Sequence, residues 1–390
     1  MNRRNFLQLT ATGTGGLLVL PNFLLSKNLW TNFKDYTNDN ILIFIQLNGG
    51  NDGLNTIIPF ENSLYYYNRP SIGIAKEKVI NKNRGIGFHP ALKDLANISQ
   101  EGNLSIIQNV GYPNPNRSHF RSQEIWQTAS DSDKYVDYGW LGRFLDIQCK
   151  DENLASINID SIENLALKSP SINGITVKDF NKIKNYATDN KKLKLSDNPQ
   201  LDFVRKIQYA SLEGMEELNK ALQNSGNYNE IYAQNPLSKN LEWMAKLIKG
   251  NLNSKIYYTS LNGFDTHNNQ NQVHNKQLTQ LNDSVYSFYK DMKTNNLLDK
   301  VTVVIFSEFG RRVKENGTGT DHGTAGPMLI IGGNNKGKVI GKNPDLSNLD
   351  KGDLIFEIDF RSVYATLLKE KFSFDAKAIS IDNELIKGLF

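Results

Sequence analysis

The chain has 390 residues, of which 39% are hydrophobic and 22% are charged. This composition is typical of a globular protein, and the length allows two domains or one large α/β domain. The formal net charge of +4 is spread without basic blocks, which excludes the basic surface expected of a nucleic-acid-binding protein. The single cysteine, Cys149, excludes an intrachain disulfide and a cysteine-based zinc site, so a metal site must use histidines and carboxylates.

The N-terminal segment has the pattern of an export signal. Arg3, Arg4, Phe6 and Leu7 match the core of a twin-arginine signal, and a weakly apolar stretch follows them. We therefore predict that residues 1–36 are a signal and short linker. The twin-arginine translocase is then the partner during export, and the mature protein is periplasmic or extracellular. The alternative is an uncleaved amphipathic N-terminus.

Six apolar runs of strand length follow the signal. They are apolar almost throughout, which is typical of strands buried on both faces in a parallel sheet covered by helices. The predicted strands are Ile41–Leu47, Leu104–Val110, Leu154–Ile159, Lys255–Leu261, Val301–Phe306 and Met328–Gly333.

Amphipathic segments between these strands predict the crossover helices. The predicted helices are Pro90–Glu101, Ser118–Thr128, Phe203–Gln223, Ser238–Gly250, Asn271–Asn295 and Asp359–Lys371. The expected fold class is α/β: a doubly wound, mostly parallel central sheet with helices on both faces. This domain is expected over residues 37–390, with residues 149–234 as a cap or insertion because their periodicity is weaker.

Three polar clusters come directly after predicted strands. "NGGNDG" carries Asp52, "NGFDTH" carries Asp265 and His267, and "SEFGRR" carries Glu308 and Arg311. In open α/β sheets, ligands bind outside the carboxyl ends of the strands. We therefore expect these clusters to converge in space although they are distant in sequence.

The candidate metal ligands are carboxylates and imidazoles, without thiolates. This set suits Zn, Mn or Mg rather than copper or iron–sulfur chemistry. The candidates are Asp52, Asp265, His267, Glu308, Asp321 and His322. A single ion needs three or four of them, and two ions could share all six, so we predict one or two divalent ions.

Ser118 adds a candidate nucleophile. It lies between Arg117 and His119 and precedes a predicted helix, so its plainer role is the helix N-cap. The alternative makes Ser118 a nucleophile activated by a metal or by His119, with Arg117 or Arg311 holding the anionic oxygens of an ester. The sequence has no GxSxG motif, so it gives no sign of an α/β-hydrolase triad.

Other conspicuous residues have plainer interpretations. His89 precedes a proline at a predicted helix start and is expected to be structural. His274 lies two helical turns after His267 and is expected to be structural or to face solvent. Trp126 and Trp140 are expected in the core.

Several motifs, in this order, resemble the domain of unknown function 1501 (DUF1501) family. Together they cover nearly the whole mature chain. The motifs are "LNGGNDGLNTIIP", "GIGFHPAL", "NRSHFRSQEIWQ", "GWLGRFLD", "GFDTHNNQ", "SEFGRRVKENGTGTDHGTAGPMLIIGG" and "DFRSVYATLL". That family looks distantly related to the alkaline phosphatase and sulfatase superfamily. The resemblance implies a doubly wound α/β fold and metal-dependent hydrolysis of phosphate or sulfate esters.

The resemblance also implies roles for matched positions. Asp52 matches the superfamily's first metal-binding acid, and Ser118 matches its nucleophile. Asp265 and His267 match an acid and a histidine that share one metal. His322, with Asp321 before it, stands near the last histidine ligand.

One position departs from the superfamily pattern. Glu308 stands where an Asp-His pair is normal, and the next residue is Phe309, which cannot bind a metal. This leaves two functional alternatives. The first is an exported hydrolase of an anionic ester, such as a sulfated or phosphorylated glycan. The second is a catalytically inactive protein that grips a glycan or an exported partner protein.

Overall fold

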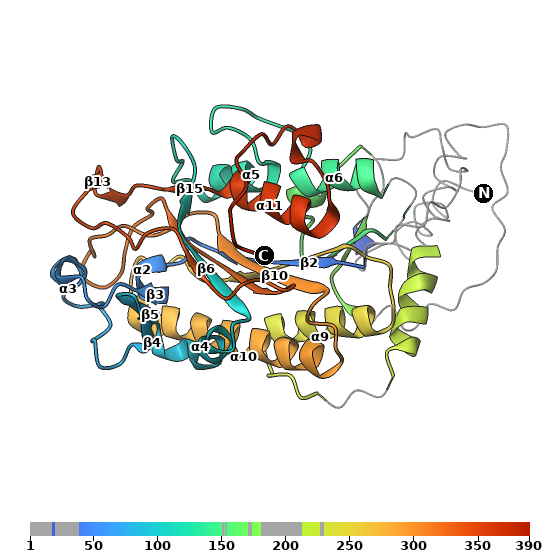
Figure 1. Ribbon diagram of the computed structural model, residues 1–390, viewed down its shortest axis with the longest axis horizontal. Helices are drawn as coiled ribbons and strands as arrows, with labels where there is room; N and C mark the ends of the chain where they lie inside the picture. Colours follow the sequence, from blue (N-terminus) through green and yellow to red (C-terminus); the bar gives the residue numbers. More distant parts are fainter. Residues whose placement is uncertain are drawn as a thin grey trace, which may run out of the picture. The chain divides into compact units, whose positions relative to one another are not determined.

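The computed structural model describes residues 18–19, 39–149, 152, 154–170, 174–180, 213–226 and 230–390 (Figure 1). The arginine pair of the predicted export signal lies outside these residues. The chain divides into two compact units. The larger comprises Asn38–Val136, Glu230–Glu242 and Thr259–Phe390, and the smaller contains Asp137–Asn229 and Trp243–Tyr258.

The larger unit is built on a mixed, mostly parallel sheet. The strand order is β2 (Ile41–Asn48), β10 (Val301–Ser307), β11 (Gly326–Gly332), β6 (Leu104–Gly111) and β12 (Val339–Ile340). β2 and β10 are parallel, in register from Ile41 with Val301 to Leu47 with Ser307. β12 and β15 (Ile358–Asp359) both pair with β6 in parallel. The predicted α/β class with a mostly parallel sheet is confirmed.

β11 is the antiparallel member of this sheet. It runs opposite to both β10 and β6. Residues 308–325, which lead into it, contain no helix, and a chain that returns without a crossover pairs antiparallel. The start of β11 therefore lies at the same edge as the ends of β2, β10 and β6.

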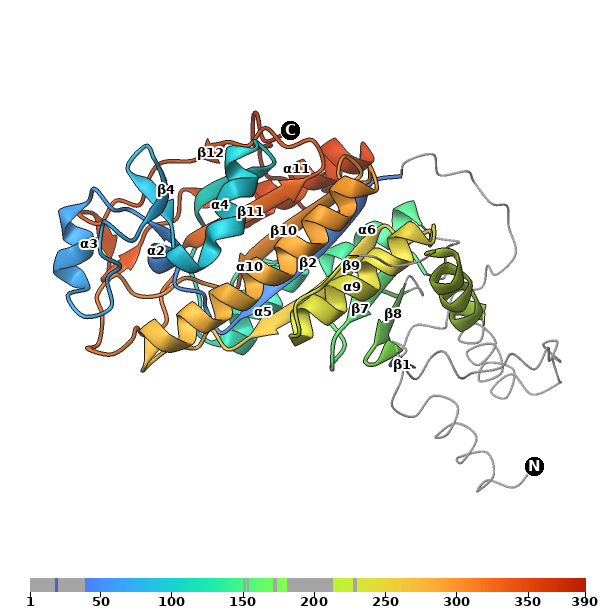
Figure 2. The same cartoon turned by 90° about the horizontal axis from the view of Figure 1, so that it is seen from below.

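Helices cover both faces of this sheet. α5 (His119–Thr128) and α11 (Phe360–Phe372) lie on one face, and α4 (Lys93–Gln100) and α10 (Gln270–Thr294) lie on the other (Figures 1 and 2). Trp126 on α5 is buried and stacks between Phe306 and Phe360, with ring centroids 5.2 and 4.4 Å away. These helices follow the predicted ranges to within a turn.

Shorter elements complete the larger unit. β3, β5 and β4 form a small antiparallel sheet. The elements are α2 (Gly53–Thr56), β3 (Ile57–Ile58), α3 (Ser63–Asn68), β4 (Ile80–Asn83), β5 (Ile86–Phe88), η1 (Pro90–Leu92), β13 (Leu349–Asp350), β14 (Asp353–Leu354) and η3 (Ala376–Ile379). None of the helices that the structure describes is long and apolar enough to cross a membrane.

In the smaller unit, β7 (Ser156–Ile159) pairs in parallel with β8 (Gly174–Val177) and with β9 (Ile256–Asn262), whose last residues belong to the larger unit. β1 (Leu18–Val19) pairs antiparallel with β8. The remaining elements are α6 (Trp140–Gln148), η2 (Leu165–Leu167), α9 (Pro236–Lys249), which begins in the larger unit, and a helical stretch over 213–224. The first part of the predicted helix Phe203–Gln223 lies outside the described residues.

α6 is a helix that the sequence pattern did not predict. Gly142 interrupts its short apolar pattern, but a Cβ there would lie 2.2 Å from the Lys168 carbonyl oxygen, so the packing requires glycine. Trp140, the first residue of α6, is buried as expected.

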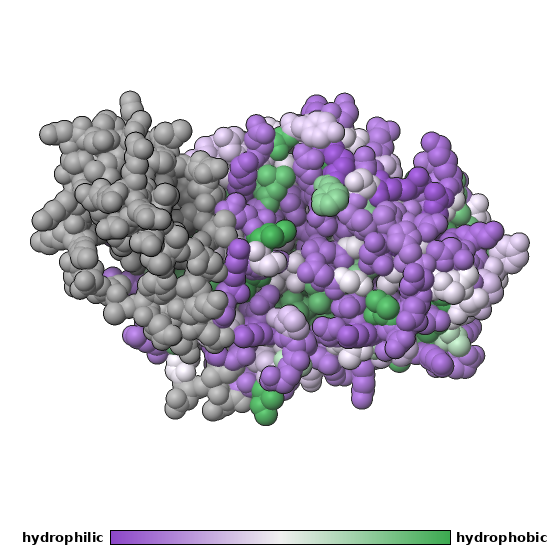
Figure 3. All heavy atoms as spheres, turned by 180° about the vertical axis from the view of Figure 1, so that it is seen from behind, coloured by the Kyte–Doolittle hydropathy of each residue, from purple (hydrophilic) through white to green (hydrophobic). Residues whose placement is uncertain are grey.

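On the face seen in Figure 3, the described surface is mainly hydrophilic, with apolar side chains separated from one another.

Candidate metal centre

The loops at the carboxyl edge of the larger unit's sheet come together. The Phe264 amide, just after β9, donates to the Asn48 carbonyl at the end of β2, at 3.1 Å. Arg311, after β10, forms an isolated antiparallel bridge with His322, which leads into β11. These contacts bring together polar segments that lie far apart in the sequence.

Four side chains in these loops form a cluster that we call the imidazole cluster: His119, Asp265, His267 and His322. The Nε2 atoms of His267 and His322 lie 3.0 Å apart. Oδ1 of Asp265 lies 3.1 Å from Nε2 of His267 and 3.2 Å from Nε2 of His322. Nε2 of His119 lies 3.5 Å from the other oxygen of Asp265.

The other ring nitrogen of each histidine faces a hydrogen-bond acceptor. Nδ1 of His119 lies 2.9 Å from Oε1 of Glu308, and Nδ1 of His267 lies 3.0 Å from Oδ1 of Asp321. Nδ1 of His322 lies 2.8 Å from the carbonyl oxygen of Arg117. Because these partners accept, each Nδ1 carries a proton, and in its neutral form each ring presents the lone pair of Nε2 to the cluster.

Such an arrangement fits a bound cation. Lone pairs of His267 and His322 at 3.0 Å repel unless a proton or a metal ion lies between them. Ligand atoms in a tetrahedral site with bonds of about 2.0–2.1 Å are roughly 3.3 Å apart, close to the spacings observed here. Metal-bound histidines also characteristically donate their second nitrogen to a carboxylate or carbonyl.

His119 supports the same interpretation. Among the described residues, its Nε2 is buried without a hydrogen-bond partner. Ligand atoms of His119, Asp265 and His322 all lie within 4.8 Å of one another, which allows one ion to reach all three. The sequence predicted His119 only as a residue that could activate Ser118, and it did not predict that His119 would lie in this cluster.

Glu308 lies behind His119 rather than facing the centre of the cluster. It is fully buried and also accepts from the Gly49 amide and the Ser307 hydroxyl, both at 2.9 Å. Burial acts to raise the pKa of Glu308, but the hydrogen bonds, first from His119, leave it lowered. The hydrogen bond to Glu308 raises the pKa of His119 in return. Glu308, predicted as a ligand, thus orients the His119 ring and does not itself face the centre of the cluster.

Asp321 has the same relation to His267. Its side chain is 59% exposed, and its Oδ1 accepts from His267 and, at 3.4 Å, from Asn316. The hydrogen bond from His267 lowers the pKa of Asp321. Of the six predicted ligands, the structure therefore places Asp265, His267 and His322 inside the cluster, and it places Glu308 and Asp321 behind its histidines.

Asp52 lies in a different, fully buried network. Its Oδ2 is 2.5 Å from NH1 of Arg69 and also accepts from Gln270, and its Oδ1 caps α2 at the Asn55 amide. Burial acts to raise the pKa of Asp52, but Arg69 holds it below its usual value. Among the described residues, the group whose ligand atoms all lie within 4.8 Å of one another is His119, Asp265 and His322. His267 is not in that group but contacts Asp265 and His322 through its Nε2, whereas the partners of Asp52 are Arg69, Gln270 and Asn55, so we omit Asp52 from the candidate metal centre.

The two predicted anion-binding arginines are both engaged within the protein. The guanidinium of Arg311 is 0% exposed, and donates to the carbonyls of Gly49, Gly50, Phe264 and Thr320 and to Oδ1 of Asp265. It joins the loops and orients Asp265, and it does not face solvent. Arg117 forms an ion pair with the buried Asp353.

Ser118 is the N-cap of α5 and is exposed. Its side chain makes no capping hydrogen bond, so the hydroxyl is not committed to the helix end. On its two sides, the Arg117 carbonyl holds His322 and the His119 ring belongs to the cluster. Ser118 therefore occupies the predicted N-cap position without making the capping hydrogen bond.

Phe309 packs beneath the imidazoles. It is 3% exposed, and its ring centroid lies 4.9 Å from that of His119 and 5.0 Å from that of His322.

The two other histidines lie outside the cluster. His274 is buried and faces Oδ1 of Asn51 at 2.9 Å, and His89 caps η1 through the Ala91 amide. Both are structural, as expected for His89 and as one alternative for His274.

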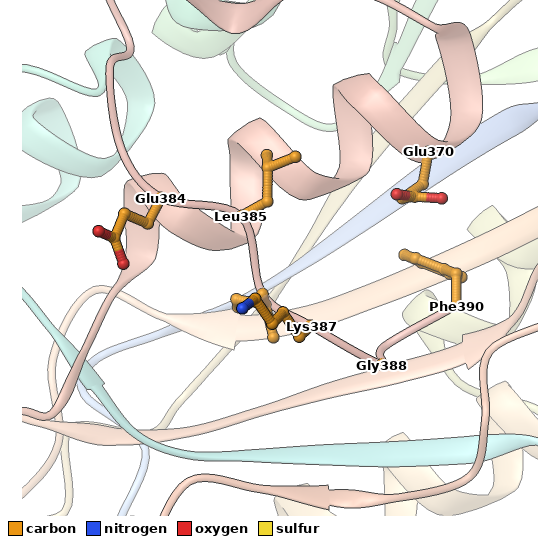
Figure 4. Close-up of a pocket in the computed structure, with 7 residues that line it drawn as sticks. Glu370, Glu384, Leu385, Lys387, Gly388 and Phe390 are labelled. Carbon is orange, nitrogen blue, oxygen red and sulfur yellow. The ribbon is translucent and has the colours of Figure 1, made fainter.

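A surface pocket of about 530 Å³ lies between α11 and the C-terminal segment, away from these residues (Figure 4). It contains none of the predicted site residues. It is lined by Glu370, Glu384, Leu385, Ile386, Lys387, Gly388 and Phe390.

Comparison with solved structures finds similar chains at low identity. A sulfatase, PsFucS1 from Pseudoalteromonas sp., is 9% identical over 91% of this chain and 74% of its own, with a TM-score of 0.42. A protein in the alkaline phosphatase superfamily from Vibrio parahaemolyticus is 10% identical over 94% and 74%, with a TM-score of 0.38. The C-terminal periplasmic domain of EcEptC from Escherichia coli, in complex with Zn, is 12% identical over 79% and 77%, with a TM-score of 0.37.

None of the curated proteins compared matches the chain. A family profile does match, over a segment that contains Asp265, His267, Glu308, Arg311 and His322. Residues 252–370 match the family described as Protein of unknown function (DUF1501), which confirms the resemblance read from the motifs.

Proposed function

We propose that this protein is an exported, metal-dependent hydrolase of phosphate or sulfate esters. The observation that carries the proposal is the convergence of the Nε2 atoms of His119, His267 and His322 on Asp265, while each Nδ1 is held by an acceptor. These four residues would hold the divalent ion, with Zn, Mn or Mg as candidates. When bound, such an ion polarises an ester oxygen and neutralises negative charge.

Ser118 is the proposed nucleophile. Its oxygen would form a bond to phosphorus or sulfur as the bond to the alcohol breaks, and the alcohol would take a proton from water. The proton of Ser118 would pass to solvent, to which this residue is exposed. The oxygen of a water molecule would then bond to phosphorus or sulfur as the bond to the serine oxygen breaks, and the serine oxygen would take up the proton that the water gives up, which releases phosphate or sulfate and restores Ser118. The positive end of the α5 dipole at Ser118 favours an anionic group there.

The anionic oxygens would not need Arg117 or Arg311 in this scheme. Arg117 is paired with Asp353 and Arg311 with Asp265, so each charge is already balanced. The ion and the N-terminus of α5 would take that role. Our proposed substrate class is a sulfated or phosphorylated glycan. Our proposed protein partners are the twin-arginine translocase and an exported partner protein.

A specific observation favours a second candidate, a binding protein without catalysis. Phe309 fills the space beside His119 and His322 with an apolar ring, so a second ion would find no ligand from that position. A protein of this kind would use the same centre to grip an anionic glycan or partner.

Hydrolysis of aryl phosphates and aryl sulfates, with and without a chelator, tests the proposal. The hydrolase predicts turnover that chelation abolishes, that added Zn, Mn or Mg restores, and that Ser118→Ala eliminates. Metal binding without turnover on either ester class would favour the binding protein instead. Turnover that persists in both Ser118→Ala and His322→Ala would contradict the proposed site.

A further inference from the structure

One buried amide connects the two loops that carry most of the imidazole cluster. Gln270, the first residue of α10, is 0% exposed. Its Oε1 accepts from the hydroxyl of Thr266 at 3.1 Å and from the hydroxyl of Thr320 at 2.6 Å. Thr266 lies between Asp265 and His267. Thr320 directly precedes the segment of Asp321 and His322.

The orientation of this amide is fixed from its other side. Nε2 of Gln270 donates to Oδ2 of Asp52. The Asp52 carboxylate can only accept, so the amide nitrogen must face it and the amide oxygen must face the two threonines. Arg69 and the capping bond to the Asn55 amide hold Asp52 in turn. Asp52 thus sets which way Gln270 points.

The backbone around Gln270 joins the same loops. The backbone N–H of Gln270 donates to the Thr318 carbonyl at 2.9 Å, and the backbone N–H of Thr320 donates to the Thr266 carbonyl at 3.1 Å. Thr266 and Thr320 are buried. If the Gln270 side chain were apolar, their hydroxyls would lose a buried acceptor, which favours loops that move apart to reach water.

We propose that Gln270, anchored by Asp52, is a positioning residue that sets the spacing between His267 and His322. Its importance for catalysis rests on the proposed function, but the ring positions themselves can be observed without a metal. The hydrogen-bond partners of the Gln270 side chain are Thr266, Thr320 and Asp52, none of which belongs to the imidazole cluster. It acts through Thr266 and Thr320.

The test uses the full chain, metal-free, with ¹⁵N-labelled histidine. The chain has 5 histidines, so long-range ¹H–¹⁵N spectra separate every ring. In the wild type, Nδ1 of His119, His267 and His322 should each hold its proton against exchange with solvent, because each donates to a fixed acceptor, and we call such a ring locked. In Gln270→Leu the rings of His267 and His322 should lose this protection and average, while His119, whose Nδ1 is held by Glu308, stays locked.

Leu278→Ala is the matched control. Leu278 is a buried residue of the same helix, about two turns beyond Gln270, and its truncation destabilises the fold without removing any hydrogen bond of Gln270. It should leave all three rings locked. The double variant Thr266→Val/Thr320→Val, which removes both hydroxyls, should reproduce the Gln270→Leu spectrum. The double variant Thr266→Ser/Thr320→Ser, which keeps them, should give the wild-type spectrum. If Gln270→Leu fails to fold, these two double variants decide the question.

The inference is overturned if Gln270→Leu, or the double valine variant where Gln270→Leu does not fold, leaves His267 and His322 as in the wild type. It is also overturned if the His119 ring becomes averaged to the same extent as the rings of His267 and His322, because the variant would then have loosened the whole cluster. Zinc titration of the same samples is a separate readout, with affinity expected to fall on the order of tenfold in Gln270→Leu. A wild type that takes up no zinc would defeat the proposed function, and the ring spectra would still decide this inference.

Discussion

Nδ1 of His119 lies 2.9 Å from Oε1 of Glu308, a carboxylate that is fully buried and that also accepts from the Gly49 amide. This contact holds one nitrogen of the ring so that the other faces Asp265. The loop after β10 therefore controls the orientation of a side chain on α5.

Glu308→Gln should weaken metal binding by about 10–100-fold, the usual effect of removing a partner behind a metal-binding histidine. The amide can still accept from His119 and can donate to Ser307, so the fold should persist. Isothermal titration with zinc measures the effect. Glu101→Gln, which removes a carboxylate from a surface pair with Lys293, is the control and should bind as the wild type does. Equal affinity in Glu308→Gln would refute the orienting role.

Ser118→Ala should abolish ester hydrolysis but should change the free energy of unfolding by no more than about 0.5 kcal/mol. The residue is exposed and makes no capping hydrogen bond, so the fold does not depend on its hydroxyl. Urea denaturation and zinc titration should match the wild type. Ser63→Ala, at the exposed start of α3, should keep full activity. Unimpaired turnover in Ser118→Ala would exclude serine as the nucleophile.

The buried pair of Asp52 and Arg69 should matter for stability. Asp52→Asn leaves Arg69 without its carboxylate in a site where both side chains are 0% exposed, and should cost about 3–5 kcal/mol at neutral pH. Because Arg69 lowers the folded-state pKa of Asp52, this stabilisation is present above the unfolded pKa and disappears as pH falls through the folded pKa. Urea denaturation from about pH 7 to pH 3 should show the gap between wild type and variant narrowing. If the difference in unfolding free energy between wild type and variant grew as the pH fell, the pKa of Asp52 would be raised, not lowered, in the folded protein.

Gly50→Ala should disturb the floor of the imidazole cluster. Gly50 has a φ of +74°, and a Cβ there would lie 2.3 Å from Cε2 of Phe309. The backbone strain costs about 1–2 kcal/mol and the overpacking about 1–3 kcal/mol. Gly102→Ala is the matched control, since Gly102 has a φ of +79° but nothing within 4 Å of the added Cβ. Thermal unfolding should separate the two variants, and equal losses would mean that the Phe309 contact is unimportant.

Much of the fold could be predicted because its strands are continuous apolar runs. Val301–Ser307 is buried along nearly its whole length, which is the pattern that predicts an internal strand. The convergence of the loops that carry Asp52, Asp265 and Glu308 followed from where strands end. The direction of β11 was not visible in its own residues, because it depends on how the chain returns to the sheet.

The sequence could not predict which carboxylates face the imidazole cluster and which lie behind or outside it. Asp52 and Glu308 both follow strands directly, and their sequence contexts resemble that of Asp265. What separates them is a tertiary partner: Arg69 reaches Asp52 from a loop, and His119 reaches Glu308 from α5. The role of Gln270 was hidden for the same reason, since the three hydrogen bonds of its side chain come from three separate segments.

The central claim is that His119, Asp265, His267 and His322 hold a divalent ion. Its most direct test is elemental mass spectrometry of protein purified after native production, compared with His267→Ala/His322→Ala and with His89→Asn, which alters a histidine outside the cluster. Near-stoichiometric Zn, Mn or Mg in the wild type and in His89→Asn, lost from the double variant, is the predicted result. Wild-type protein that carries no metal and takes up none on addition would contradict the claim.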